Sequence, residues 1–225
     1  MIVTMVGSNA AALDSGDDGR SARKRRGILE AAAIVFLRKG YLGATMDEIA
    51  ALASVSKQTV YKHFADKETL FSEIVTNTVD EASDRVQAEL RTLAHSGDIE
   101  ADLRELARRQ LALVLQPQIL QLRRLVIGEA GRFPELGRLF HERGPGRTIG
   151  TLAEMFEGLA ARGLLQVDDP QLAAQHFNWL VMSIPLNEAM LLGDDEPATD
   201  ADLDRYAIEG VRVFLAAYRA TAATR

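Results

Sequence analysis

Apolar residues recur at helical spacing along almost the whole chain, and no window alternates between apolar and polar residues as a half-buried strand does. Breaks in the pattern fall at turn residues such as Gly40, Gly163 and the Gly-Pro-Gly run at 144–146. We predict an all-α fold of about nine to ten helices, over residues 21–39, 46–53, 57–64, 67–94, 99–115, 118–132, 135–142, 148–161, 170–192 and 200–220.

Two of the predicted helices are short and joined by a tight turn, at residues 45–64. Thr45 and Glu48 fit a capping box at the start of the first, and Ser56 fits an N-cap for the second. Ser54 and Val55 form the turn. The apolar residues of the first helix share one buried face, at positions i, i+3, i+4 and i+7: Met46, Ile49, Ala50 and Ala53. This spacing predicts a helix-turn-helix.

The second short helix has two unlike sides. Val60 and Phe64 are four residues apart and point inward, whereas Gln58, Tyr61 and Lys62 point outward. A row of cationic, amide and hydroxyl groups suits phosphates and base edges, so we interpret this helix as a recognition helix for the DNA major groove. An ordinary solvated helix face is the alternative. The interlocking of the inward and outward sets over the whole motif argues against it.

The distribution of charge supports the same interpretation. Residues 20–67 contain ten basic and four acidic side chains, a net charge of +6, within a chain of 225 residues whose net charge is −6. Four of the basic residues, 23–26, lie near the start of the first predicted helix, where they oppose the helix dipole and a polyanion would stabilise them. A solubilising tail is the alternative for this run. A basic head on an acidic body is typical of DNA-binding proteins.

The rest of the composition argues against a membrane protein, a secreted protein, a metalloprotein and an enzyme. The chain has no Cys, no apolar run near the ~20 residues that span a bilayer, and no signal-peptide pattern, so we expect a cytoplasmic protein without membrane contact. Residues 1–19 are small and acidic and predict a disordered tail. No spacing of the four His residues suits a metal, and the acids at 200, 202 and 204 fit a helix start better than a calcium loop. We predict no catalytic residue, no metal and no cofactor.

The N-terminal part of the chain resembles a known protein family. The features that carry the resemblance are, in order, the basic run, Gly40-Tyr41, Thr45-Met46, Ile49-Ala50, Val55-Ser56, Tyr61, Phe64 and Asp66-Lys67-Glu68 with Leu70. They resemble the DNA-binding head of the TetR family of bacterial transcriptional regulators, and residues 123–136 resemble the C-terminal domains of its AefR-like branch. One departure is Ser54, where the family usually has Gly at a left-handed position. Ser there is expected to cost about 1 kcal/mol.

The resemblance implies a helix-turn-helix domain at 20–66 and a helical effector-binding and dimerisation domain at 67–225. It places Thr45 and Tyr61 on phosphates, and Lys67 on a phosphate together with the amides that begin its helix. Residues 57–59 approach base edges, and residues 62–63 follow the DNA backbone. The implied DNA contacts are Arg23, Arg26, Thr45, Ser56, Lys57, Gln58, Thr59, Tyr61, Lys62, His63 and Lys67.

The last two long helices are the predicted dimer element. The helix at 170–192 is apolar nearly all round, so both its own domain and a partner subunit would have to cover it. The predicted seam on the final helix is Leu203, Ala207, Gly210, Val211, Phe214 and Tyr218. Gly210 would permit the close approach of a second helix. A two-fold homodimer would demand an inverted-repeat operator in double-stranded DNA.

A small-molecule effector site is expected among the central helices. The candidates are Arg123, Phe133, Phe140, Met155, Phe156, His176, Phe177, Trp179 and Met182, with Arg124 as a second possible anionic anchor. Ordinary core packing is the favoured alternative for each apolar member taken singly. Trp179 and His176 are preferred because a buried indole or imidazole must find a polar partner.

The sequence thus predicts a dimeric repressor that a small, mostly apolar ligand releases from an inverted-repeat operator. The alternatives are an activator or a protein-responsive regulator of the same fold, and a helical interaction protein that does not bind DNA.

Overall fold

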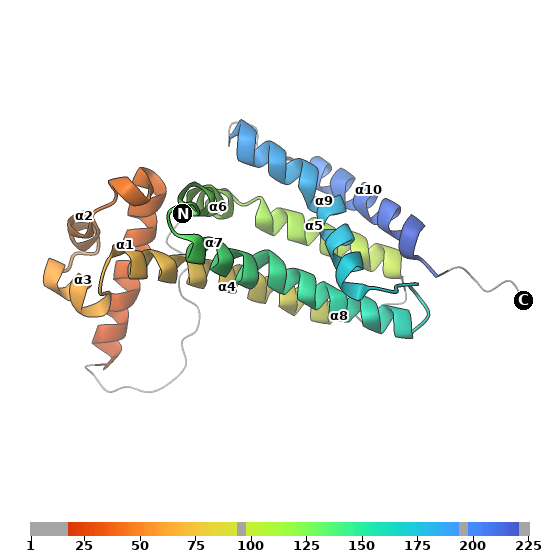
Figure 1. Ribbon diagram of the computed structural model, residues 1–225, viewed down its shortest axis with the longest axis horizontal. Coiled ribbons are helices and arrows are strands. Elements are labelled where there is room, and N and C mark those ends of the chain that lie inside the picture. Colours follow the sequence, from red (N-terminus) through yellow and green to blue (C-terminus); the bar gives the residue numbers. More distant parts are fainter. Residues whose placement is uncertain (1–17, 94–97, 194–197, 221–225) are drawn as a thin grey trace, which may run out of the picture. The chain divides into compact units, whose positions relative to one another are not determined.

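The computed structural model describes residues 18–93, 98–193 and 198–220, and within these ranges it is helical with no strand (Figure 1). The all-α prediction is confirmed. The elements are α1 (Asp18–Gly43), α2 (Met46–Leu52), α3 (Lys57–His63), α4 (Lys67–Leu93), α5 (Ile99–Val114), α6 (Pro117–Glu129), α7 (Pro134–His141), the π-helical turn η1 (Glu142–Gly146), α8 (Arg147–Ala161), α9 (Pro170–Leu192) and α10 (Asp200–Tyr218).

Most helix starts follow from capping residues. The Asp66 carboxylate accepts a hydrogen bond from the Thr69 amide at 2.7 Å as α4 begins, and Asp169 caps α9, which opens on Pro170. A full capping box joins Thr199 and Asp202 at the start of α10, so the acids there do mark a helix N-terminus.

Two predicted boundaries are wrong. The Gly-Pro-Gly run at 144–146 does not separate two helices: it lies in η1, whose wider turn accommodates Pro145 and joins α7 to α8. Helix α1 begins at Asp18, so Asp18 and Gly19 are helical rather than part of a tail, and residues 1–17 lie outside the described residues. The basic run at 23–26 therefore follows the first turn, where the helix dipole acts only weakly on it.

The chain divides into two compact units. The head unit consists of the described residues up to Val79 together with residues 121–140, and the body unit consists of residues 80–120 and 141–225 as far as they are described. The predicted boundary after residue 66 marks the end of the three-helix motif, but the head unit extends beyond it into α4 and takes in most of α6 and α7.

Each unit has its own apolar core. In the head unit, Phe36 and Tyr41 from α1 pack against Phe71 from α4, with ring centroids 4.9 and 5.2 Å from it. In the body unit, Phe214 from α10 lies 4.9 Å from Phe156 of α8 and 5.3 Å from Phe177 of α9. Aromatic pairs at these distances stabilise beyond the area that they bury.

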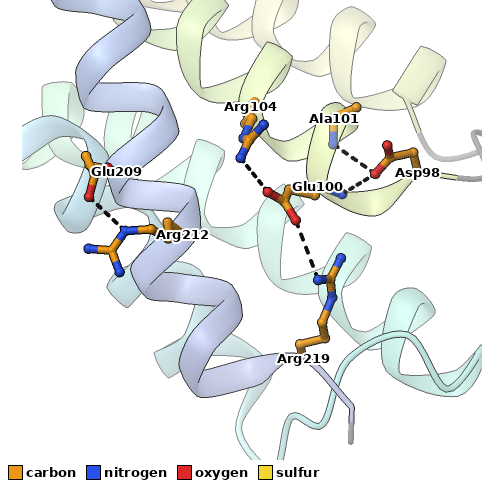
Figure 2. A network of polar contacts seen from close by, with 7 residues as sticks. All are labelled: Asp98, Glu100, Ala101, Arg104, Glu209, Arg212 and Arg219. Carbon is orange, nitrogen blue, oxygen red and sulfur yellow. Dashed lines mark hydrogen bonds and ion pairs between the residues drawn. The ribbon is translucent and has the colours of Figure 1, made fainter. Parts of the chain in front are cut away.

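Helices α5 and α10 of the body unit pack antiparallel. At the start of α5, Glu100 pairs with Arg104 and with Arg219 from the end of α10, the latter at 3.5 Å (Figure 2). Further along α5, Arg108 donates to Asp204 near the start of α10 at 2.9 Å. The pairs Glu100–Arg219 and Arg108–Asp204 link the two elements at opposite ends, and each of these partly exposed pairs adds little stability.

Candidate nucleic-acid interface

The turn between α2 and α3 has the predicted form. Ser54 adopts φ +55°, a left-handed value that no other non-glycine described residue has. The Val55 amide donates to the Ala50 carbonyl at 3.0 Å and the Ser54 amide donates to the Ala51 carbonyl at 3.2 Å, which closes the end of α2. This geometry sets the direction in which α3 leaves the turn.

Both short helices begin at the predicted caps, but the first capping box is incomplete. The Thr45 hydroxyl accepts from the Glu48 amide at 3.2 Å, and the Ser56 hydroxyl accepts from the Thr59 amide at 3.1 Å. The Glu48 carboxylate contacts Lys39 and the Thr45 hydroxyl rather than the Thr45 amide. The hydrogen bond from Lys39 is the main cause of a lowered pKa at Glu48.

Helix α3 has the two predicted sides. Val60 and Phe64 are buried in the core of the head unit, whereas Gln58, Tyr61 and Lys62 are exposed. Within the described residues, this helix therefore presents an amide, a phenol and an ammonium group to solvent. That combination can bond both base edges and phosphate oxygens.

Electrostatic contacts constrain several cations of the interface. Lys57 donates to the Asp47 carboxylate at 2.7 Å, and this hydrogen bond raises the pKa of Lys57. Arg25 pairs with Glu73 at 2.5 Å and lies over the Phe64 ring at 5.1 Å. Asp47 was not predicted as a partner of the recognition helix.

Partial burial and nearby cations act on the imidazole of His63. Burial lowers its pKa most, and the positive charges of Arg25, Lys62 and Lys24 lower it further. A phosphate beside His63 would reverse this effect. The same cations make the region attractive to a polyanion.

Lys67 has a structural role in the folded head. Its ammonium donates to the carbonyls of Tyr41 and Ala44 at 2.8 and 2.9 Å and lies 4.5 Å from the centre of the Tyr41 ring. It therefore ties the start of α4 to the end of α1. The phosphate contact expected of Lys67 stays a prediction, as do the contacts of Arg23, Arg26 and the other residues of the implied set.

The predicted dimer seam is wrong. Leu203, Ala207, Val211 and Phe214 are buried inside the body unit, so they cannot face a partner. Gly210 does permit a close helix approach, but to α9 of the same chain: a β-carbon there would lie 2.9 Å from Val181 Cγ2. Tyr218 bonds His176 of α9 at 2.6 Å. The helical spacing identified one face of α10 correctly but assigned it to the wrong neighbour.

A different set of apolar side chains on these two helices is exposed. Helix α9 supplies most of it and α10 supplies the rest: Leu172, Trp179, Leu180, Ile184, Leu191, Leu192, Ile208 and Val213. Exposed large apolar residues gathered on two packed helices are typical of a protein interface.

The predicted effector residues fall in both units. In the head unit, Phe133 packs on Tyr41 at 4.8 Å and Phe140 lies under Arg123 at 5.3 Å. Burial lowers the pKa of Arg123.

In the body unit, Phe156, Phe177 and Met182 belong to the buried core and Met155 packs against it. The expectation that Trp179 and His176 are buried is wrong: both are exposed, Trp179 by 46%.

Sequence reasoning missed one buried polar pair. Gln110 of α5 and Asn178 of α9 lie in the body unit's core and are joined by a hydrogen bond of 2.9 Å. The sequence does contain a sign of this pair, because Gln110 lies on the buried face of α5, seven residues after Leu103 and three after Ala107. A polar residue at an apolar position of an amphipathic helix marks such pairs.

Among the described residues, no three His, Asp or Glu side chains are grouped as metal ligands, and no helix has the length and apolarity needed to cross a membrane.

The fold and the exposed polar face of α3 define a helix-turn-helix transcriptional regulator. Residues 28–74 match the family model described as bacterial regulatory proteins of the tetR family, and residues 101–220 match the C-terminal domain of AefR-like transcriptional repressors. The chain belongs to the TetR family, whose members are regulators and not enzymes.

Solved structures agree with this assignment. A TetR-family regulator from Mesorhizobium loti is 45% identical, with a TM-score of 0.84 over 89% of this chain and 98% of its own. The flavonoid-responsive regulator FrrA is 32% identical, with a TM-score of 0.70 over 89% of this chain and 100% of its own.

Named relatives match over a shorter stretch. The transcriptional activator FasR of Mycolicibacterium smegmatis is 44% identical over 70 residues, 31% of this chain and 32% of its own. The regulator YhgD of Bacillus subtilis is 46% identical over 61 residues, 27% of this chain and 32% of its own. This chain thus spans about a third of the length of these relatives.

Proposed function

We propose that the protein is a dimeric repressor that binds an inverted-repeat operator through α3 and leaves it when a small, mostly apolar ligand binds. The observation that carries the proposal is the exposed face of α3, where Gln58, Tyr61 and Lys62 project from a helix held by buried Val60 and Phe64. Gln can bond adenine in bidentate fashion, and Lys can bond guanine or phosphate. The site of action would be the bacterial cytoplasm, where the DNA is.

Similar proteins support the proposed repression and the proposed class of ligand. The match of residues 101–220 to a repressor domain supports repression. FasR is named an activator, but its match covers only 31% of this chain. FrrA is named flavonoid-responsive and aligns over its whole chain, which supports a small, largely apolar effector.

The dimer is proposed through the exposed apolar set on α9 and α10 rather than the buried seam. Trp179 and Ile184 are 46% and 54% exposed near the middle of α9. A two-fold axis through this face would present the same patch on both subunits, which gives an operator with two-fold symmetry.

Selection of binding sites from a random duplex library with the purified full chain tests the proposal. We expect an enriched inverted repeat. Gln58→Ala should lose preference at one base pair of each half-site, since it removes a base-reading amide and leaves the helix intact.

The matched control is Lys62→Ala. It should weaken binding to all sequences equally and reduce the slope of log K against log salt by about one per subunit. Lys67 is a poor control because it also holds the Tyr41 and Ala44 carbonyls. Failure to enrich any repeat at low salt would overturn the proposal, and unchanged preference in Gln58→Ala would overturn the base contact.

A further inference from the structure

Two amide side chains interrupt the apolar core of the body unit. Gln110 of α5 is 4% exposed and Asn178 of α9 is 5% exposed. Gln110 Nε2 donates a hydrogen bond to Asn178 Oδ1 at 2.9 Å. The pair joins two helices that have no other buried polar bond between them among the described residues.

One atom of this pair has no partner. Gln110 Oε1 is fully buried and accepts no hydrogen bond in the described part of the chain. If both side-chain amides are rotated by 180°, Asn178 Nδ2 donates to Gln110 Oε1 and the pair stays bonded. Gln110 Nε2 then takes the position without a partner, so one polar atom of Gln110 is unsatisfied in either orientation. A buried acceptor without a donor destabilises a fold, because the group has lost its hydrogen bonds to water and gained none in return.

The residues one helical turn from the pair on each helix are apolar. One helical turn from Gln110 lie Leu106 and Ala107, and one turn from Asn178 lie Val181 and Met182, all buried in the same core. A molecule bound there would meet an apolar surface and a single strong acceptor. Such a site favours a neutral, apolar body that carries one hydrogen-bond donor.

A purely structural role explains the pair poorly. Two apolar side chains of similar shape would fill this position at little or no loss of stability. A structural network would also be expected to satisfy every buried polar atom.

The core can adapt to an added molecule near this point. Met182 follows Asn178 by one turn, and Met155 packs partly buried against the same core. Unbranched thioether side chains change conformation at low cost and fill irregular spaces.

We propose that Gln110 Oε1 is the polar anchor of the effector site and accepts a hydrogen bond from a neutral, apolar ligand that carries a hydroxyl donor, such as a phenol. Asn178 is a positioning residue that holds the Gln110 amide with this oxygen free. This inference rests on the proposed function, because it names the chemistry of the effector assigned there.

Matched pairs of ligands test the proposal on the purified full chain. The probes are 4-phenylphenol, 4-cyclohexylphenol and 2-naphthol, each beside its methyl ether, which keeps the shape and the oxygen but lacks the donor. We expect at least one phenol to raise the melting temperature, and to release the selected operator at a concentration at least tenfold below that of its ether.

The decisive variant is Gln110→Met with Asn178→Val, which removes both amides together. It should melt at or above the temperature of the wild-type protein and bind the operator unchanged, while the preference for the phenol over its ether disappears. Gln166→Met, at an exposed position before α9, is the matched control and should keep the preference.

Three results would overturn the inference: ethers that bind as well as phenols, a double variant that keeps the preference, or no response to any of the phenols. If the double variant does not fold, Gln110→Met alone gives the same comparison. Ligand binding is read by melting as well as by DNA release. A wild-type protein that binds phenols but no DNA would therefore contradict the proposed function and leave the anchor standing.

Discussion

At the scale of single residues, Ser54 carries backbone strain at the centre of the helix-turn-helix. Its φ of +55° is a conformation that Gly adopts freely and Ser does not. Ser54→Gly should therefore raise the free energy of unfolding by about 0.5–1 kcal/mol, measured by urea denaturation. Ala51→Gly, on the exposed side of α2, is the control and should lower it by a similar amount. A neutral or destabilising Ser54→Gly would contradict this account.

The lowered pKa of His63 leads us to expect that DNA binding depends on pH. Its pKa is lowered from the ordinary 6.5 in the free protein, first by burial and then by Arg25, Lys62 and Lys24. The fold therefore favours the neutral imidazole, and the stability that this contributes above pH 6.5 is lost as the pH falls below 6.5 through the lowered pKa.

A phosphate beside the ring would favour the protonated form and raise its pKa. Affinity for the operator should therefore increase as the pH falls from 7.5 to 6.5, by at most about tenfold per subunit. Titration of binding by fluorescence anisotropy measures this dependence. His63→Gln should flatten it, and an unchanged dependence in that variant would remove His63 from the interface.

Residues whose role depends on the local chain were the predictable ones. The caps Thr45, Ser56 and Asp66 and the strained Ser54 all follow from short-range hydrogen bonding and backbone sterics. The exposure of Trp179 did not follow, because burial depends on elements far away in the sequence.

At the scale of elements, Gly210 sets how closely α9 and α10 pack. A β-carbon there would lie 2.9 Å from Val181 Cγ2 and 3.3 Å from the Leu180 carbonyl oxygen. Gly210→Ala should therefore lower the free energy of unfolding by about 1–3 kcal/mol, although Ala favours helix by about 1 kcal/mol.

Gly158 in α8 provides the comparison for this change. A β-carbon there meets nothing within 4 Å, so Gly158→Ala should stabilise the chain by up to about 1 kcal/mol. Thermal melting of both variants checks the pair of signs. The same sign in both would mean that helix packing at Gly210 is looser than the distances imply.

The helices themselves could be predicted from periodicity, but their neighbours could not. The pattern of α10 identifies a buried face that contains Leu203 and Phe214. It does not say whether α9 of the same chain or a second subunit covers that face. The π-helical turn through Pro145 was also out of reach, because Gly and Pro ordinarily indicate a break.

At the scale of the whole molecule, the exposed face of α9 predicts the oligomeric state. Trp179→Glu with Ile184→Glu would place four charges in a two-fold interface, two from each subunit, and should convert the proposed dimer into a monomer. Sedimentation velocity measures this change. Ile127→Glu, at a residue of α6 that is 60% exposed in the head unit, is the control and should leave the mass unchanged. A double variant that sediments like the wild-type protein would place the interface elsewhere.

The division into units was only partly predictable. Helix α3 ends at His63, one residue from its predicted end, because its capping is local. The inclusion of residues 121–140 in the head unit is a long-range effect that no local pattern announces.

The same division has a consequence for folding. The chain passes between the units three times, after Val79 in α4, after Leu120 in α6 and after Phe140 in α7, and each passage lies inside a helix. A helix that crosses from one unit to the other keeps its backbone hydrogen bonds through the crossing point. A substitution that unfolds one of these helices where the chain crosses would therefore disturb the folding of both units at once.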